Sequence, residues 1–129
     1  MKREEQKFFI CKHCGNIVGL INNAKVPLVC CGEKMTELVP NTTDASVEKH
    51  LPVVKVDGNK VTVEVGSAPH PMTEEHYISW VYIETEKGGQ RKVLEPGEKP
   101  YTEFILTDDD KVLNVFAYCN LHGLWKTSV

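Results

Sequence analysis

Four cysteines lie within the first 31 residues at a spacing typical of metal binding. Cys11 and Cys14 enclose two residues, and the adjacent Cys30 and Cys31 follow after a longer spacer. Four thiolates on one ion suit the tetrahedral shell of either zinc or iron, whereas a disulfide between neighbouring cysteines would be strained. The spacing therefore predicts a four-cysteine metal centre and leaves the choice of metal open. His13, inside the first pair, is interpreted as a solvated spacer.

A second set of potential ligands is spread over the rest of the chain. Each of its histidines, taken alone, is most simply a surface residue. All of them, however, stand beside prolines, glycines or charged residues, and loops at strand ends are where ligands on a β scaffold usually lie. Imidazole and thiolate together suit a transition metal. We therefore predict a second metal centre from five residues: His50, His70, His76, Cys119 and His122.

The chemistry expected of this second set is the reduction of a small anion. Four imidazoles and one thiolate on ferrous iron leave one octahedral position open and give a charge of +2 − 1 = +1. A thiolate opposite the open position donates electron density and favours reduction of what binds there. The chain's net charge of −3 gives no overall attraction to an anion, so Lys49 is the candidate for a local field and Glu48 for reaching the open position. The alternative for both is a solvated pair in a loop.

The elements that must position these side chains are predicted to be short β-strands. Residues 53–66 contain two apolar runs around a turn signal at 57–59, and Val61, Val63 and Val65 alternate with polar residues. Two similar patterns follow, with turns predicted at Gly88-Gly89 and at residues 108–111. No segment shows sustained helical periodicity. The pattern indicates an antiparallel β-sandwich.

The predicted strand before Cys119 is expected to carry this cysteine on its apolar face. Leu113, Val115 and Ala117 share the strand parity of Cys119, and Gly123 then permits a turn. Before the predicted strands, residues 39–52 are polar with a proline near each end and are interpreted as a linker that runs into a loop. The chain is thus predicted to hold a metal domain at 1–38 and a sandwich at 39–129.

Composition excludes several classes of function. The chain is 41% hydrophobic and 26% charged, which is typical of a globular protein, and its slight negative charge gives no reason to expect a nucleic-acid partner. No apolar run approaches the roughly 20 residues that span a bilayer, and the N-terminus lacks the apolar core of a signal peptide. We therefore expect a cytoplasmic protein without membrane attachment, where clustered cysteines are more often metal ligands than disulfides.

Five motifs, in this order and over nearly the whole chain, resemble desulfoferrodoxin, the two-iron form of superoxide reductase: "CKHCGN", "CCGEKM", "EKHLPV", "HPMTEEHYI" and "YCNLHGLWK". The resemblance implies an all-β chain with a desulforedoxin-like or rubredoxin-like N-terminal domain and an immunoglobulin-like sandwich. It implies one iron in the N-terminal domain and a second, catalytic iron in the sandwich. The first iron is expected on Cys11, Cys14, Cys30 and Cys31, and the second on equatorial His50, His70, His76 and His122 with axial Cys119.

The resemblance also implies an activity and partners. Superoxide would be reduced by one electron to hydrogen peroxide, with Lys49 attracting the anion and helping to protonate the product, and with Glu48 able to ligate the oxidised iron. A rubredoxin-like protein would donate the electrons, and the chain would form a homodimer. Two other functions are considered: an iron protein that only transfers electrons, and a zinc-stabilised sandwich that acts as a binding module.

Overall fold

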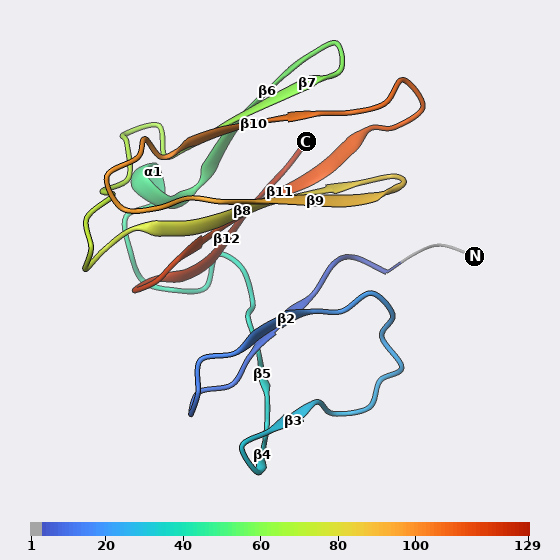
Figure 1. The fold of residues 1–129 in the computed structure, drawn as a ribbon, viewed down its shortest axis with the longest axis vertical. Helices are drawn as coiled ribbons and strands as arrows, with labels where there is room; N and C mark the ends of the chain where they lie inside the picture. Colours follow the sequence, from blue (N-terminus) through green and yellow to red (C-terminus); the bar gives the residue numbers. More distant parts are fainter. Residues whose placement is uncertain (1–3) are drawn as a thin grey trace. The chain divides into compact units, whose positions relative to one another are not determined.

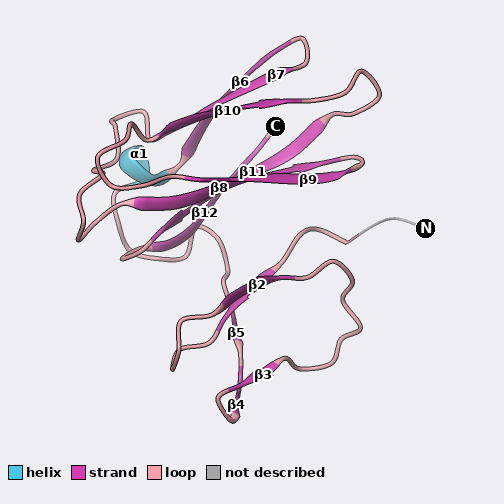
Figure 2. Ribbon diagram, in the orientation of Figure 1, coloured by secondary structure: helices cyan, strands magenta, loops and turns pink. Residues whose placement is uncertain are grey.

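Strands form every regular element but one in residues 4–129, the part of the chain that this computed structural model describes (Figure 1, Figure 2). The exception is a single helical turn, α1 (Val47–His50). The chain separates into two compact units, Met1–Val39 and Pro40–Val129, and each is described by itself. Within residues 4–129, no helix has the length and apolar character needed to cross a bilayer.

The small unit has very little core. Phe8 and Cys11 are the only buried side chains among its described residues. Such a core cannot offset the conformational entropy that the segment loses on folding, so a cross-link through a metal is needed. Its strands pair antiparallel in the order β2-β1-β5, with β3 paired to β4. The strands are β1 (Phe8–Ile10), β2 (Ile17–Gly19), β3 (Val29–Cys30), β4 (Glu33–Lys34) and β5 (Thr36–Glu37).

The large unit is an antiparallel sandwich of a three-stranded and a four-stranded sheet. The strand orders are β10-β7-β6 and β12-β11-β8-β9. Three strands facing four is a common arrangement of immunoglobulin-like sandwiches, so the predicted all-β fold is confirmed. The strands are β6 (Pro52–Asp57), β7 (Lys60–Val65), β8 (Ile78–Thr85), β9 (Gly88–Val93), β10 (Tyr101–Ile105), β11 (Val112–Cys119) and β12 (Gly123–Ser128).

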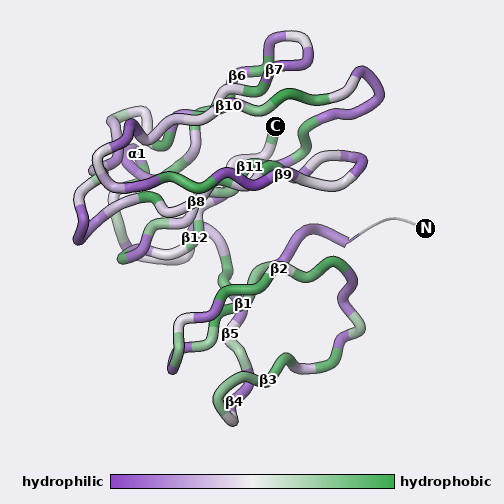
Figure 3. Tube along the Cα trace, viewed as in Figure 1, coloured by the Kyte–Doolittle hydropathy of each residue, from purple (hydrophilic) through white to green (hydrophobic). Residues whose placement is uncertain are grey.

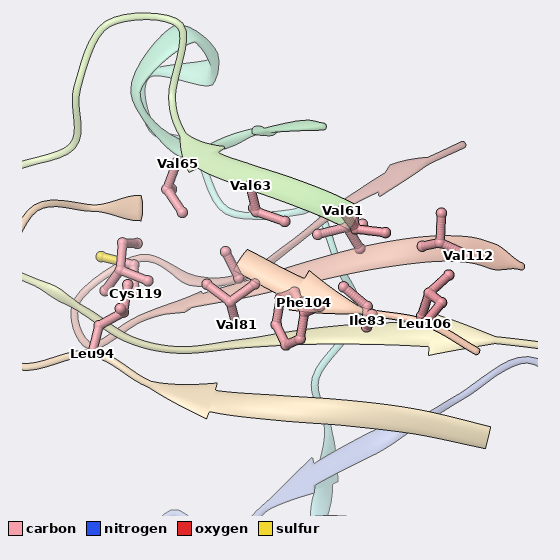
Figure 4. Close-up of a cluster of buried hydrophobic side chains, with 13 residues drawn as sticks. Val61, Val63, Val65, Val81, Ile83, Leu94, Phe104, Leu106, Val112 and Cys119 are labelled. Atoms are coloured by element: carbon pink, nitrogen blue, oxygen red, sulfur yellow. The ribbon is translucent and has the colours of Figure 1, made fainter. Parts of the chain in front are cut away.

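The core of the sandwich lies between its two sheets. The predicted alternation along β7 is confirmed, because Val61, Val63 and Val65 are fully buried. Burial of each such side chain contributes roughly 1.5–3 kcal/mol. Figure 4 shows Cys119 at one end of this cluster with Leu94 and Val65, far from Val112 at the other end. Figure 3 shows hydrophilic residues at the tips of the β6–β7 and β10–β11 turns.

The turn of the β8–β9 hairpin comes two residues earlier than predicted. Strand β8 ends at Thr85 and β9 begins at Gly88, so the turn consists of residues 86 and 87. Gly89 lies inside β9, where an added Cβ would overlap the ring and hydroxyl of Tyr82 on the neighbouring strand. The glycine is therefore required by a close approach within the sheet, and the prediction of a Gly88-Gly89 turn was wrong.

Leu113 was wrongly placed on the apolar face of β11. The pairing of β11 with β8 shifts register between Val112 and Asn114, which changes the face that each side chain meets. Val112 is therefore buried and Leu113 is partly exposed to solvent, whereas Val115, Ala117 and Cys119 are fully buried as expected. A second register shift falls between Tyr118 and Cys119, and Cys119 nevertheless keeps the predicted buried position.

Candidate metal centres

The four cysteine sulfurs of the small unit converge on one point. All lie within 4.8 Å of one another, and Cys14 Sγ is 3.6 Å from Cys30 Sγ. None of these cysteines is in a disulfide. Cys31 (φ 52°) adopts a left-handed backbone conformation that turns its thiol toward the others. Four sulfurs at this spacing fit the tetrahedral shell of zinc or iron.

Without a bound cation, ionisation of one thiol in the cluster makes ionisation of the others less favourable. The backbone N–H of Cys14 lowers the pKa of Cys11 to about 6, while hydrogen bonding with Cys11 raises the pKa of Cys31 to about 12. One thiolate in the cluster therefore suppresses the formation of others. A bound metal ion removes this opposition, because its charge stabilises all four thiolates.

The second centre lies at one end of the sandwich, where three segments of the chain meet. His50 is the last residue of α1, His70 and His76 lie in the β7–β8 loop, and Cys119 ends β11. His122 lies in the turn between β11 and β12. All five predicted ligands thus come from this one end of the unit.

The four imidazole rings form a closed square. The centroid of the His70 ring lies 4.6 Å from those of both His50 and His76. The centroid of the His122 ring lies 5.0 Å from those of the same two histidines. The planes of neighbouring rings cross at 79° to 82°. His50 and His76, which face each other across the square, are 6.2 Å apart. The ring edges therefore surround a common centre, as the equatorial ligands of a metal ion do.

Two hydrogen bonds determine which nitrogens face this centre. The Nδ1–H of His50 donates to the carbonyl of Ser46, and that of His70 donates to the carbonyl of Pro71, both at 2.7 Å. Because a carbonyl can only accept, the proton of each neutral ring is on Nδ1. The two Nε2 atoms then face each other at 3.2 Å with lone pairs and no proton between them. A cation between them would relieve this repulsion.

Three further donor atoms complete the set. Nε2 of His76 is buried and has no hydrogen-bond partner among the described residues. His122 presents Nδ1, which lies 3.1 Å from His50 Nε2 and 3.9 Å from Cys119 Sγ. The donor atoms of His50, His76, Cys119 and His122 all lie within 4.8 Å of one another. His70 is outside this set of four, but its Nε2 contacts His50 in the same centre.

Burial disfavours the charged forms of three imidazoles and of the thiol in the second centre. Burial lowers the pKa of His50, His70 and His76, that of His70 to about 4. Burial also raises the pKa of Cys119, although amide hydrogen bonds from the two residues 121 and 122 oppose this effect. A metal ion therefore meets neutral imidazoles at neutral pH and must displace one thiol proton.

This burial makes the metal-free sandwich sensitive to acid. The pKa of His70 is below its ordinary value of 6.5, so the unfolded chain binds the proton first as pH falls. The contribution of neutral His70 to the free energy of unfolding is therefore fully present above pH 6.5 and is lost as pH falls toward 4. For His70 alone we expect a loss of about 2 kcal/mol between pH 7 and pH 5.

Urea unfolding of the metal-free chain at the two pH values measures this loss. The two tryptophans, Trp80 and Trp125, both lie in the large unit and report on it alone. His70→Asn serves as the control and should remove most of the difference between the pH values. Equal stability of the parent chain at pH 7 and pH 5 would contradict the expectation.

Glu48 and Lys49 lie on α1, which corrects the prediction that this segment is an extended linker and loop. In a helical turn, Glu48 and His50 do not share a side as they would in a strand. The carboxylate of Glu48 is held by its own backbone N–H, which lowers the pKa of Glu48. The charge of Lys49 lowers the pKa of both His50 and His76, so the ammonium lies within electrostatic reach of the rings.

Sequence reasoning missed a tryptophan that supports two of the ligands. The ring of Trp125 stacks on His50 at 4.8 Å, and its Nε1–H donates to the carbonyl of His122 at 3.1 Å. Trp125 pairs with Ala117 across the β11–β12 hairpin, and both residues are buried. The combination of a tryptophan opposite an alanine, next to the motif "CNLHG", is the only signal that the sequence offered.

A glycine after β7 was missed as well. The Gly66 N–H donates to the Leu51 carbonyl at 3.1 Å, and the Ala68 N–H donates to the Glu48 carbonyl at 2.9 Å. These bonds join α1 to the loop that carries His70. Gly66 has φ +88°, and an added Cβ would lie 2.7 Å from the Lys49 carbonyl oxygen. The closeness of these two backbone segments therefore depends on the absence of a side chain.

Comparison with known proteins gives a consistent result over both units. A family model described as "Desulfoferrodoxin" matches residues 42–128, and one described as "Desulfoferrodoxin, N-terminal domain" matches residues 3–38. A desulfoferrodoxin homolog from Archaeoglobus fulgidus is 44% identical over 124 residues, 96% of this chain and 98% of that protein. A desulfoferrodoxin from Nitratidesulfovibrio vulgaris is 41% identical over 95% of both chains.

A solved structure is similar over the same length. The superoxide reductase from Treponema pallidum has a TM-score of 0.82 and 42% sequence identity, and the alignment covers 97% of this chain and all of that one. The likeness therefore includes the four-cysteine unit as well as the sandwich.

Proposed function

This chain belongs to the desulfoferrodoxin family, and on that premise we propose how it works as a superoxide reductase. Superoxide accepts one electron and two protons at the histidine and cysteine centre and leaves as hydrogen peroxide. The observation that carries this proposal is the convergence of His50, His76, His122 and the Cys119 thiol within 4.8 Å. Their inward lone pairs form a donor set that suits iron.

The chain has two iron centres, one for each donor set. Ferrous iron held by the second set would supply the electron that superoxide accepts. We propose residues 1–38 as the four-cysteine iron domain and residues 39–129 as the domain of the reactive centre. The proposed ligands of the first iron are Cys11, Cys14, Cys30 and Cys31, and those of the second are His50, His70, His76, Cys119 and His122.

The protein's own groups prepare the second centre for an anion. The buried imidazoles stay neutral at pH 7, so they present lone pairs inward and no competing protons. The Cys119 thiolate, which forms once the thiol proton is displaced, is the one negative charge among the proposed ligands of the second centre. The ammonium of Lys49 adds a positive field that reaches the ring of His76. Superoxide is therefore drawn to the end of the sandwich despite the net charge of −3.

We propose that Lys49 increases the rate at which superoxide arrives. Lys49→Ala should lower the second-order rate constant for superoxide reduction roughly threefold to tenfold at low salt, and should weaken its dependence on ionic strength. Pulse radiolysis at several salt concentrations measures both quantities. Lys55→Ala, which removes an exposed lysine from β6, is the matched control and should leave both unchanged. An unaltered salt dependence in Lys49→Ala would argue against steering.

Glu48 is proposed to bind at the open position of the oxidised centre. Its carboxylate must first leave the hydrogen bond with its own backbone N–H. We also propose a rubredoxin-like electron donor, a homodimer and a cytoplasmic location. These last three proposals rest on the family alone.

Metal analysis and rapid kinetics test the proposed function. Two iron ions per chain, and oxidation of the reduced histidine centre by superoxide at a nearly diffusion-limited rate, are the expected results. A colourless protein that contains zinc and no iron would favour a binding module instead. Iron that superoxide does not oxidise would favour a protein that only transfers electrons.

A further inference from the structure

Asn120 connects the cysteine of the second centre to the segment that carries His76. It directly follows Cys119 in the chain, in the turn after β11. Its side-chain Oδ1 accepts a hydrogen bond from the Tyr77 N–H at 2.9 Å, and its Nδ2 donates to the Glu75 carbonyl at 2.9 Å. The two bonds therefore fall on the residues immediately before and after His76.

Asn120 also uses its backbone for the same contact. Its N–H donates to the Tyr77 carbonyl at 3.2 Å. Three hydrogen bonds thus join one residue to a three-residue segment that lies 43 to 45 positions earlier in the chain. The backbone of His76 itself makes only local hydrogen bonds among the described residues: its N–H and its carbonyl are bonded to Thr73 in the same loop.

The ring of His76 differs from those of His50 and His70 in what holds it. The Nδ1 atoms of His50 and His70 are bonded to backbone carbonyls. His76 Nε2 is buried without a partner, and no hydrogen bond to either ring nitrogen of His76 occurs within residues 4–129. Apart from its contacts with the rings of His70 and His122, this ring is positioned by its backbone, which Asn120 and the Thr73 turn hold.

We propose that Asn120 is a positioning residue that sets the place of the His76 imidazole relative to the Cys119 sulfur. This inference rests on the proposed function, since it assumes that both groups bind the same iron. One end of Asn120 is covalently joined to Cys119 and the other is hydrogen-bonded on both sides of His76. A displacement of either ligand is thereby transmitted to the other through a single side chain.

The role requires an amide at this position. The primary amides of asparagine and glutamine present an NH2 donor and a carbonyl acceptor on one planar group, and the shorter asparagine side chain keeps residues 75–77 close to the turn. In Asn120→Asp the second carboxylate oxygen would face the Glu75 carbonyl oxygen at about the distance where Nδ2 now donates, and the two acceptors would repel each other. The backbone bond to Tyr77 remains in this variant, so the sandwich is expected to fold.

The test compares Asn120→Asp and Asn120→Ala with a matched control, Asn114→Ala. Asn114 lies on the same strand β11, and its amide also makes two side-chain bonds, to Glu84 and Ser128, but at the opposite end of the sandwich. Ferrous iron affinity of the second centre, by competition with a chelator, should fall roughly 10-fold to 100-fold in the Asn120 variants. The thiolate-to-iron absorption band of the oxidised protein should shift. The control should lose stability and change neither property.

A readout without metal keeps the inference separate from the proposed function. In the metal-free chain, the NMR signals of the His76 imidazole should shift or broaden in both Asn120 variants and stay unchanged in Asn114→Ala. Variants of Asn120 with parental His76 signals, iron affinity and absorption band would overturn the inference. A parent chain that binds no iron at this centre would overturn the proposed function, and the His76 signals would then decide the inference alone.

Discussion

Replacing Cys119 with serine is expected to abolish superoxide reduction. Serine keeps the size of the side chain but offers a neutral hydroxyl in place of a thiolate. The second centre would lose its one proposed anionic ligand and its charge would rise from +1 to +2, so electron donation toward superoxide would fall. Loss of a group next to a metal ligand typically costs 10-fold to 100-fold, so we expect at least a roughly 100-fold loss when a ligand itself is removed.

Pulse radiolysis of the pre-reduced Cys119→Ser protein measures this loss. The visible spectrum of the oxidised protein should lack the thiolate-to-iron band of the second centre and keep the absorption of the four-cysteine centre. A buried hydroxyl at this fully buried position also costs about 1–3 kcal/mol if it finds no partner, so unfolding should be measured alongside. Parental rates in this variant would contradict the proposed role of the thiolate.

Cys11→Ser is the matched control, because Cys11 is also a buried cysteine in a metal centre and directly follows strand β1. This variant should lose or alter the spectrum of the four-cysteine centre. In a single turnover with electrons already on the second centre, its rate of superoxide reduction should equal that of the parent chain. A loss as large as in Cys119→Ser would show that the first centre is needed for the chemical step.

Substituting alanine for Gly66 is expected to remove iron from the second centre without changing any ligand. The added Cβ would overlap the Ala68 carbonyl oxygen and lie 2.7 Å from that of Lys49. Both obstacles are backbone atoms, so no rotation of a side chain relieves the overlap. Either α1 or the loop after β7 must move, and His50 or His70 moves with it. A shift of this kind separates the two Nε2 atoms that now lie 3.2 Å apart.

Iron per chain and urea unfolding followed by tryptophan fluorescence measure both consequences. We expect a stability loss of about 3 kcal/mol or more, beyond what a left-handed backbone conformation alone costs. Gly97→Ala is the matched control, because Gly97 has φ +91° and its Cβ would meet nothing within 4 Å. That variant should lose about 1–2 kcal/mol and keep its iron. Equal effects of the two substitutions would show that backbone strain, and not the overlap, is what matters.

The sequence alone determined the kinds of ligand and the strands that carry them. Cys11-x-x-Cys14 and Cys30-Cys31 indicate a four-thiolate centre because their spacing is local, and the alternation in β7 is readable because strand side chains repeat every two residues. The turn predicted at residues 57–59 lies at residues 58 and 59, because Asp57 still belongs to β6 and pairs with Lys60. The two mistakes in the sheets came from strand pairing: a register shift moved Leu113, and the pairing of Glu84 with Gly89 placed Gly89 inside a strand.

Only the tertiary structure decided how the second centre is assembled. His50 and His122 are 72 positions apart, yet their ring nitrogens lie 3.1 Å from each other. The choice of ring nitrogen follows from the carbonyls of Ser46 and Pro71, and no pattern in the sequence predicts these acceptors. The stack of Trp125 on His50 was invisible for the same reason. Ligand identity is a property of single residues, whereas ligand orientation depends on contacts between segments that meet only after the sandwich has folded.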